Sequence, residues 1–172
     1  MILYTYQKNI DLQAMSASES MKNDLGLKIL NKLSRFVAWD LEFDGEDETI
    51  QLKNLLEKSF FIVNPNKELY KINAIPTRAI KNDEIGIRVK VEQKISQQFD
   101  LDTLNKNCGV TLKRLSTFLI WDLYGSYDGT SSEEDYLDEV TDQVIITSNS
   151  SKGLLVNPVS ERATISLISR TS

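Results

Sequence analysis

The sequence contains no histidine, one cysteine and only seven glycines among its 172 residues, and each shortage excludes a class of chemistry. Without histidine there is no histidine general base, no Ser-His or Cys-His nucleophile pair and no histidine metal ligand. A lone cysteine, Cys108, cannot form an internal disulfide or a thiolate zinc cluster, which favours a reducing, cytoplasmic setting. The scattered glycines match neither G-x-G-x-x-G nor G-x-x-x-x-G-K, so the usual phosphate cradles are excluded.

Long apolar runs and excess positive charge are also missing. No segment approaches the roughly 18 uninterrupted apolar residues of a membrane span, and residues 1–8 lack the basic and apolar regions of an export signal. Lys and Arg number 20 against 25 Asp and Glu, a net charge of −5 that repels phosphate backbones and anionic lipid. We therefore expect neither nucleic acid nor a membrane as a partner.

What the sequence does contain is an internal repeat. Residues 30–41 align without gaps on residues 112–123, with seven identities in twelve positions. These identities include the chain's two tryptophans, Trp39 and Trp121. Further matches follow in the same order, namely Phe43-Asp44-Gly45 with Tyr127-Asp128-Gly129 and Val63-Asn64-Pro65 with Val156-Asn157-Pro158. The chain therefore reads as a duplication.

We predict a first repeat at residues 1–74, a linker at 75–84 and a second repeat at 85–172. In each repeat the apolar periodicity predicts a strand, a helix, a strand, a second helix and a last strand. The expected strands are 1–6, 36–41, 68–72, 85–91, 118–123 and 163–168, and the expected helices are 16–33, 52–60, 101–115 and 136–144. The first helix is expected to open on a capping box at Ser16-Ala-Ser-Glu19.

The order β-α-β-(β)-α-β is that of the split βαβ, ferredoxin-like arrangement, in which helices cover one face of a mostly antiparallel sheet. Because residues 118–123 are apolar on both faces, the second face needs a cover as well. We predict an α+β chain of two tandem ferredoxin-like units whose sheets pack together as a pseudo-two-fold dimer. Trp39 and Trp121 would lie in or beside that seam.

Two acidic features are candidates for chemistry. The stretches at residues 44–48 and 131–135 could supply oxygen ligands to a hard cation, but capping of the helices that follow them is favoured. Asp40 and Asp122 could form a paired-carboxylate site, against the commoner role of a strand-end aspartate that accepts from a loop amide.

Cys108 falls within an apolar helical stripe, where a small buried hydrophobe is favoured over a reactive thiol. A modest basic spot near the linker could meet an acidic partner, although ordinary mixed surface is favoured; its members are Arg78, Lys81, Arg88 and Lys90. We predict no catalytic, cofactor-binding or metal-binding residues.

The layout of each repeat resembles the small subunit of phosphoribosylformylglycinamidine synthase, the PurS family of purine biosynthesis. The segments that match its first helix are Gly26-Leu-Lys-Ile-Leu-Asn-Lys-Leu33 and Gly109-Val-Thr-Leu-Lys-Arg-Leu115. Those that match its Leu-Leu-x-Asn-Pro-x-x-Glu stretch are Leu154-Leu-Val-Asn-Pro-Val-Ser-Glu161 and Phe61-Ile-Val-Asn-Pro-Asn-Lys-Glu68. The family's Arg-x-Gly-Lys turn is replaced by Glu42-Phe-Asp-Gly45 and Tyr124-Gly-Ser-Tyr127.

This resemblance implies a non-catalytic, cytoplasmic subunit, without activity of its own or a cofactor, in an ATP-dependent amidotransferase complex. It would bridge the synthetase and glutaminase subunits so that ammonia passes between them, and the duplication would stand for the family's dimer, with further oligomerisation possible. Two alternatives remain. One is an ACT-like regulatory module that binds a small molecule between paired ferredoxin-like units, and the other is a small enzyme that uses Asp40 and Asp122.

Overall fold

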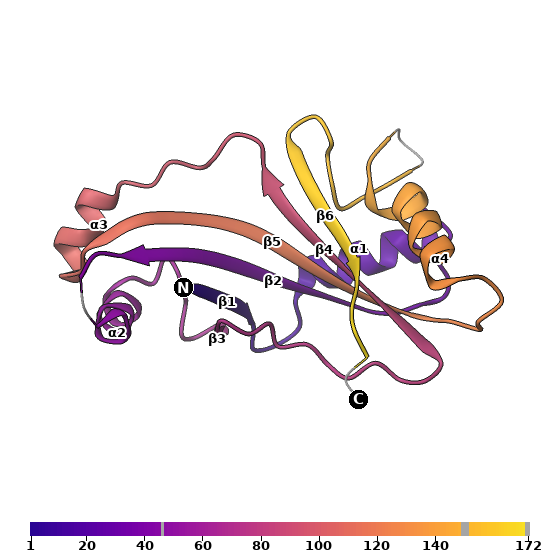
Figure 1. Ribbon diagram of the computed structural model, residues 1–172, viewed down its shortest axis with the longest axis horizontal. Coiled ribbons are helices and arrows are strands. Elements are labelled where there is room, and N and C mark those ends of the chain that lie inside the picture. Colours follow the sequence, from indigo (N-terminus) through magenta and orange to yellow (C-terminus); the bar gives the residue numbers. More distant parts are fainter. Residues whose placement is uncertain (46, 149–151, 171–172) are drawn as a thin grey trace. The chain divides into compact units, whose positions relative to one another are not determined.

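A computed structural model describes residues 1–45, 47–148 and 152–170 of the α+β chain (Figure 1). In chain order its elements are β1 (Ile2–Gln7), α1 (Leu12–Asn23), β2 (Leu30–Phe43), α2 (Glu48–Lys58), β3 (Glu68–Ile72), β4 (Glu84–Gln93), α3 (Leu101–Cys108), β5 (Leu112–Ser126), α4 (Glu133–Val140), the π-helical turn η1 (Thr141–Ile145) and β6 (Glu161–Leu167). The six strands form one antiparallel sheet in the order β3-β1-β2-β5-β4-β6. All six predicted strands are confirmed.

The prediction of two sheets packed face to face is wrong, because the strands join edge to edge in a single sheet. The long strands β2 and β5 are neighbours in that order. The Asp44 amide donates to the Thr111 carbonyl at 2.7 Å, and the Ser126 amide donates to the Ile29 carbonyl at 2.9 Å. The additional strand in the predicted order does not occur in the described part of the chain.

The first helix of each repeat is shorter than predicted and ends earlier. Helix α1 begins after Asp11, whose carboxylate accepts from the amides of Gln13 and Ala14, so the capping box at residues 16–19 lies inside the helix instead of opening it. Beyond α1 the chain passes through Gly26 in a left-handed conformation, with φ +77°, which a continuing helix does not allow.

The same correction applies to the second repeat. Helix α3 is capped by Asp100 and ends at Gly109, which has φ +67°. Leu112 and Leu115 therefore belong to β5, not to the helix. Their spacing satisfies a helical stripe as well as a buried strand, which is why periodicity misassigned them.

The described chain forms two compact units that do not coincide with the sequence repeats. Compact unit 1 comprises Met1–Asn9, Phe36–Pro76 and Ser96–Phe118, and compact unit 2 comprises Ile10–Arg35, Thr77–Ile95 and Leu119–Ser172. Consequently α3, from the second repeat, belongs to the same compact unit as β1, β3 and α2, whereas α1, from the first repeat, belongs to that of β4, β6 and α4. Each compact unit thus takes one helix from the other half of the sequence.

In compact unit 1, α2 and α3 contact each other, and Figure 1 labels both near the ends of β2 and β5. Their apolar residues share one core with residues of β1 and β2. Leu3 and Leu41 are fully buried there with Leu55 of α2 and Cys108 of α3. Cys108 is 1% exposed, which confirms that it lies in the apolar core. Trp39 also belongs to this helix-covered core.

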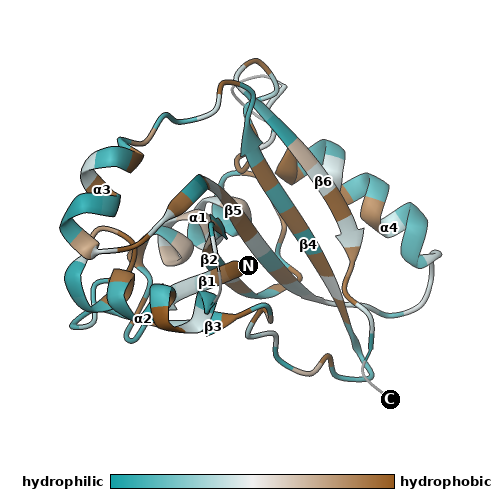
Figure 2. Ribbon diagram, turned by 60° about the vertical axis from the view of Figure 1, so that its left-hand side comes forward, coloured by the Kyte–Doolittle hydropathy of each residue, from teal (hydrophilic) through white to brown (hydrophobic). Residues whose placement is uncertain are grey.

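In compact unit 2, the helices α1 and α4 share a core with the strands, as α2 and α3 do in compact unit 1. Met21 of α1 and Val144 of η1 are fully buried against Val89 of β4. Hydropathy alternates along β4 (Figure 2), with the apolar residues in this core and Arg88 among those on the opposite face. Trp121 lies in the core under the helices, so the prediction that the tryptophans mark a seam between two sheets is wrong.

Among the residues that the structure describes, no helix combines the length and the apolar character needed to cross a membrane.

Candidate functional site

A buried ion pair lies on the face of compact unit 2 that the helices leave uncovered. Arg88 and Asp122 stand opposite each other in the β4–β5 register. Nε and Nη2 of Arg88 each donate to one carboxylate oxygen of Asp122 at 2.7 Å, and Nη2 also donates to Thr77 Oγ1 at 2.9 Å. Asp122 is fully buried. Its partner is therefore a guanidinium, not the loop amide expected from the sequence, and both of its oxygens are occupied.

A second ion pair adjoins the first. Arg78 donates from Nη1 and Nη2 to the two oxygens of Glu84 at 2.8 and 2.9 Å, while its guanidinium lies 4.0 Å from the ring centre of Tyr124. Glu84 also accepts from the side chain of Asn31 and from the amide of Lys81. The bond from Arg78, more than any other cause, lowers the pKa of Glu84 to about 2. Burial, followed by the charge of Asp122, raises the pKa of Tyr124 to about 12.

These ion pairs account for most of the basic spot. Besides Arg78 and Arg88, Lys90 pairs with Glu92 at 2.9 Å. The positive charges are thus matched by carboxylates, in agreement with the mixed surface favoured by the sequence.

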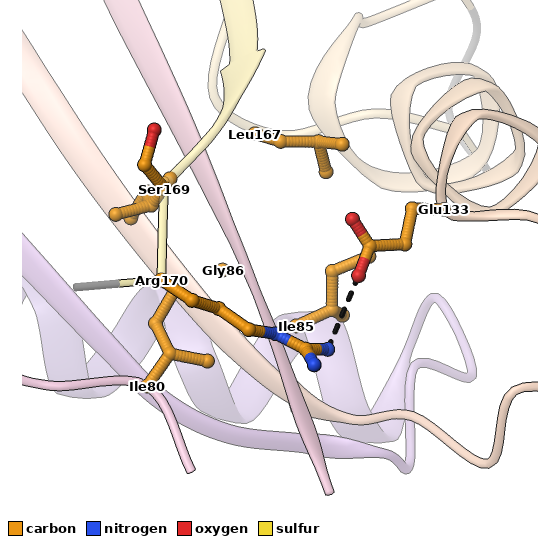
Figure 3. Close-up of a pocket in the computed structure, with 8 residues that line it drawn as sticks. Ile80, Ile85, Gly86, Glu133, Leu167, Ser169 and Arg170 are labelled. Atoms are coloured by element: carbon orange, nitrogen blue, oxygen red, sulfur yellow. Dashed lines mark hydrogen bonds and ion pairs between the residues drawn. The ribbon is translucent and has the colours of Figure 1, made fainter. Parts of the chain in front are cut away.

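Two pockets lie beside these pairs. The first has a volume of about 350 Å³ and is lined by guanidinium, hydroxyl and apolar groups of Thr77, Arg78, Ala79, Arg88, Ser166, Leu167, Ile168 and Ser169. The second, of about 370 Å³, lies where Arg170 reaches toward the first turn of α4 and pairs with Glu133 at 3.1 Å (Figure 3). Gly86 lies in its wall, and a Cβ there would come within 2.8 Å of Ile80 Cδ1. Ile80 of the linker and Ile168, near the end of the described chain, therefore pack against β4 at Gly86.

The acidic stretches act as helix caps, as the sequence favours. Asp47 accepts from the amide of Ile50 at the start of α2, and Ser132 accepts from the amide of Asp135 at the start of α4. Glu46 lies outside the described residues. Within the described ranges, no three histidine, cysteine or carboxylate side chains gather in a way that could hold a metal ion.

Asp40 is held in compact unit 1. Its carboxylate pairs at 3.1 Å with Arg114, which also donates to Glu42 at 3.0 Å. Asp40 and Asp122 belong to different compact units, and the paired-carboxylate site stays a prediction from the sequence. Each instead has an arginine partner of its own.

The structure also shows a hydrogen-bonded turn, formed twice, that we call the Asn-Pro turn; it comprises residues 64–68 in one repeat and 157–161 in the other. In the first copy Asn64 Oδ1 accepts from the Asn66 amide at 3.1 Å, and the Asn64 amide donates to Glu68 Oε2 at 2.8 Å. In the second copy, Asn157 makes the same two bonds with the Val159 amide and Glu161, at 3.0 and 2.7 Å.

The strand that precedes each first helix completes the turn. Gln7 donates to Glu68 at 3.3 Å, and Gln93 donates to Glu161 at 2.7 Å. The following lysines, Lys8 and Lys94, donate to the carbonyls of the turn prolines, Pro65 and Pro158. Sequence reasoning identified the Asn-Pro stretches but missed their partners. The Gln-Lys dipeptide that ends the first strand of both repeats was the available signal.

Comparisons with protein-family models, with curated proteins and with solved structures found no match to this chain.

Proposed function

We propose that the chain is a non-catalytic bridging subunit of a phosphoribosylformylglycinamidine synthase complex, built as two tandem PurS-like, ferredoxin-like repeats that form a pseudo-dimer. The Asn-Pro turn carries this proposal. The stretches on which the PurS resemblance rests, at residues 61–68 and 154–161, both contain this turn, with the same bonds from asparagine to glutamate and from the Gln-Lys dipeptide.

The exchange of helices between the compact units supports the same proposal. Each compact unit combines most of the strand residues of one repeat with the first helix of the other. Swapping an identical element is how two separate chains intertwine in a symmetric dimer. A tandem duplication that keeps this exchange replaces such a dimer by one chain.

A role without chemistry of its own fits the state of the candidate carboxylates. A general base needs a free oxygen that can reach a substrate proton. Asp122 is fully buried and gives both oxygens to Arg88, and Asp40 is paired with Arg114. A bridging subunit needs surface instead, and the outer edges of β3 and β6 are positions where a partner strand could add.

The test is direct capture of the two partner subunits. The immobilised chain is exposed to source-cell lysate that contains glutamine and magnesium-ADP, and the retained proteins are identified by mass spectrometry. We expect a formylglycinamide ribonucleotide synthetase together with a glutaminase. If the folded chain retains neither, the bridging role is wrong.

A matched pair of variants then asks whether the Asn-Pro turns contribute. Glu68→Gln with Glu161→Gln removes the charge that holds both turns, whereas Glu57→Gln changes a carboxylate that is 59% exposed and lies in α2. We expect the double variant to lose partner retention and Glu57→Gln to keep it. Equal retention by both would separate the turns from partner binding.

An ACT-like regulatory module is a second candidate, favoured by the pocket of about 350 Å³ that presents Arg78, Arg88, Thr77 and two serines. Its test is a thermal-shift screen of amino acids and nucleotides. A true ligand at 100 times its dissociation constant adds about 2.7 kcal/mol of stability. Ser166→Phe, which fills the pocket, should abolish that gain. No shift with any of these compounds would count against this candidate.

A further inference from the structure

The pocket beside Arg170 lies at the edge of β4, beyond the point where β6 ends. The last paired residues of the two strands are Ile87 and Leu167, and after them the Ile168 amide donates to the Gly86 carbonyl at 2.8 Å. The volume of about 370 Å³ is near the lower end of the range for small-molecule sites, about 300–1,000 Å³. The pocket therefore suits a small ligand.

Aliphatic side chains form most of the walls of this pocket. They come from the linker, β4 and the end of β6, and they are Ile80, Ile85, Leu167 and Ile168. A Cβ at Gly86 would come within 2.8 Å of Ile80 Cδ1 and 3.1 Å of Ile168 Cβ, so the glycine lets both walls approach the strand. An aliphatic group of a ligand would gain by leaving water for these walls.

Two opposite charges stand in the same pocket. Figure 3 shows the side chains of Arg170 and Glu133 pointing toward each other. Nη2 of Arg170 donates to Glu133 Oε1 at 3.1 Å and to the Glu84 carbonyl at 3.2 Å. Within the described chain, the structure shows no hydrogen bond at Nε or Nη1 of Arg170 or at Oε2 of Glu133. Both charged groups thus keep capacity for a ligand.

The pair between these charges is half exposed. The Arg170 side chain is 47% exposed and that of Glu133 is 44% exposed. Ion pairs this exposed contribute little to stability, so a ligand that inserts beside them disturbs little. A zwitterion would place its carboxylate on Arg170 and its ammonium group on Glu133. One ion pair is then extended to further charge-assisted hydrogen bonds.

The two repeats differ at this place. Glu133 has a counterpart in Glu48, since each is the first residue of its repeat's second helix. Counted from the aligned Asn-Pro turns, the position of Arg170 is held by Thr77 in the first repeat. The first repeat forms the same order of strands and helices without an arginine there. The fold therefore does not require Arg170.

We propose that this pocket binds a free α-amino acid with an aliphatic side chain of about the size of leucine. An α-amino acid carries its carboxylate and its ammonium group on the same carbon, which suits a guanidinium and a carboxylate that already touch each other. Its side chain would lie against the aliphatic walls. This site goes beyond the bridging role, and it depends neither on that role nor on the pocket of about 350 Å³.

The test is an NMR titration of the full chain, followed at the backbone amide of Gly86. The probe is L-leucine. Two matched compounds each lack one charge, because N-acetyl-L-leucine has no ammonium group and L-leucinamide has no carboxylate. We expect a saturable shift with L-leucine and binding at least about tenfold weaker for the other two, a difference of about 1.4 kcal/mol.

The same compounds distinguish a free amino acid from the end of a partner's chain. N-acetyl-L-leucine represents a C-terminal leucine, and L-leucinamide represents an N-terminal one. If either binds as tightly as L-leucine, the free amino acid is the wrong ligand. L-alanine keeps both charges with a shorter side chain and should bind about tenfold more weakly or worse. Equal binding of L-alanine would overturn the role of the aliphatic walls.

Variants with matched controls locate the site. Arg170→Gln and Glu133→Gln should each weaken L-leucine about tenfold or more. Arg162→Gln in β6 and Glu134→Gln in α4 change the same residue types outside the pocket lining and should leave the affinity unchanged. Melting temperatures without ligand show whether each variant is folded.

Ser166→Phe separates this pocket from the one of about 350 Å³. Ser166 lines only the latter of the two, so the variant should bind L-leucine as the wild type does. Loss of binding in Ser166→Phe would place the ligand in the other pocket and overturn the proposal. No response of the wild type to L-leucine, or equal affinities of the variants and their controls, would overturn it as well.

Discussion

Glu84→Gln is expected to remove a pH-dependent part of the protein's stability. The Glu84 carboxylate is 4% exposed and receives both arms of the Arg78 guanidinium, which lowers its pKa from 4.5 to about 2. Because the pKa is lower in the folded chain, the contribution is complete above the unfolded value of 4.5 and is lost as the pH falls toward 2.

The magnitude follows from this shift. Each pKa unit corresponds to 1.36 kcal/mol, so a change from 4.5 to about 2 gives at most about 3 kcal/mol at neutral pH. The Arg78 side chain is 27% exposed, and screening by solvent reduces the expected value to about 2 kcal/mol. At about pH 3 most carboxylates of the unfolded chain are protonated, and about 1 kcal/mol remains.

The assay is urea unfolding of the wild type and the variant at neutral pH and at about pH 3, followed by tryptophan fluorescence. The two proteins should differ by about twice as much at neutral pH as at the lower pH. Glu57→Gln is the matched control, since the Glu57 pair with Lys53 is exposed and should contribute less than about 0.5 kcal/mol. A Glu84→Gln cost that is independent of pH, or no larger than that of the control, would refute the reasoning.

Three further predictions concern Asp122, Gly153 and Cys108. Asp122→Leu should cost about 3 kcal/mol because it removes the buried carboxylate that accepts from Nε and Nη2 of Arg88, and Asp122→Leu with Arg88→Leu should recover part of that loss in denaturant unfolding. Gly153→Ala should cost about 3 kcal/mol or more, because the new Cβ would overlap the Ile146 carbonyl. Gly26→Ala, with a similar φ of +77° and open space around it, should cost roughly 1–2 kcal/mol. Equal melting temperatures for the two variants would contradict this account. Cys108, 1% exposed, should react with a thiol reagent only at the rate of unfolding, and fast labelling of the native protein would show that the α3 core opens.

The sequence by itself determined the strands and the repeat. The alternating segment at residues 85–91 became β4, and residues 68–72 became β3 with the predicted bounds. Both results follow from local information, because the alternation of apolar and polar residues and the turn residues that bound a strand involve only neighbouring residues. Burial of Cys108 was likewise readable from its apolar surroundings. Local chemistry also gave the helix-capping roles of the acidic stretches.

Only the tertiary structure decided where the helices end and which repeat each one packs with. Leu112 and Leu115 fit a helix or a strand equally well, and the left-handed turn at Gly109 with the pairing of β5 settled the choice. The sequence patterns do not predict that α1 and α3 are exchanged between the compact units, because either repeat offers an equivalent apolar face to a helix.

The chemistry of the candidate sites was also decided by tertiary structure. Arg88 and Asp122 are 34 residues apart, and only the β4–β5 register sets them opposite each other as a buried pair. Long-range pairing and the space left by packing depend on the whole fold, whereas sequence patterns report the preferences of neighbouring residues.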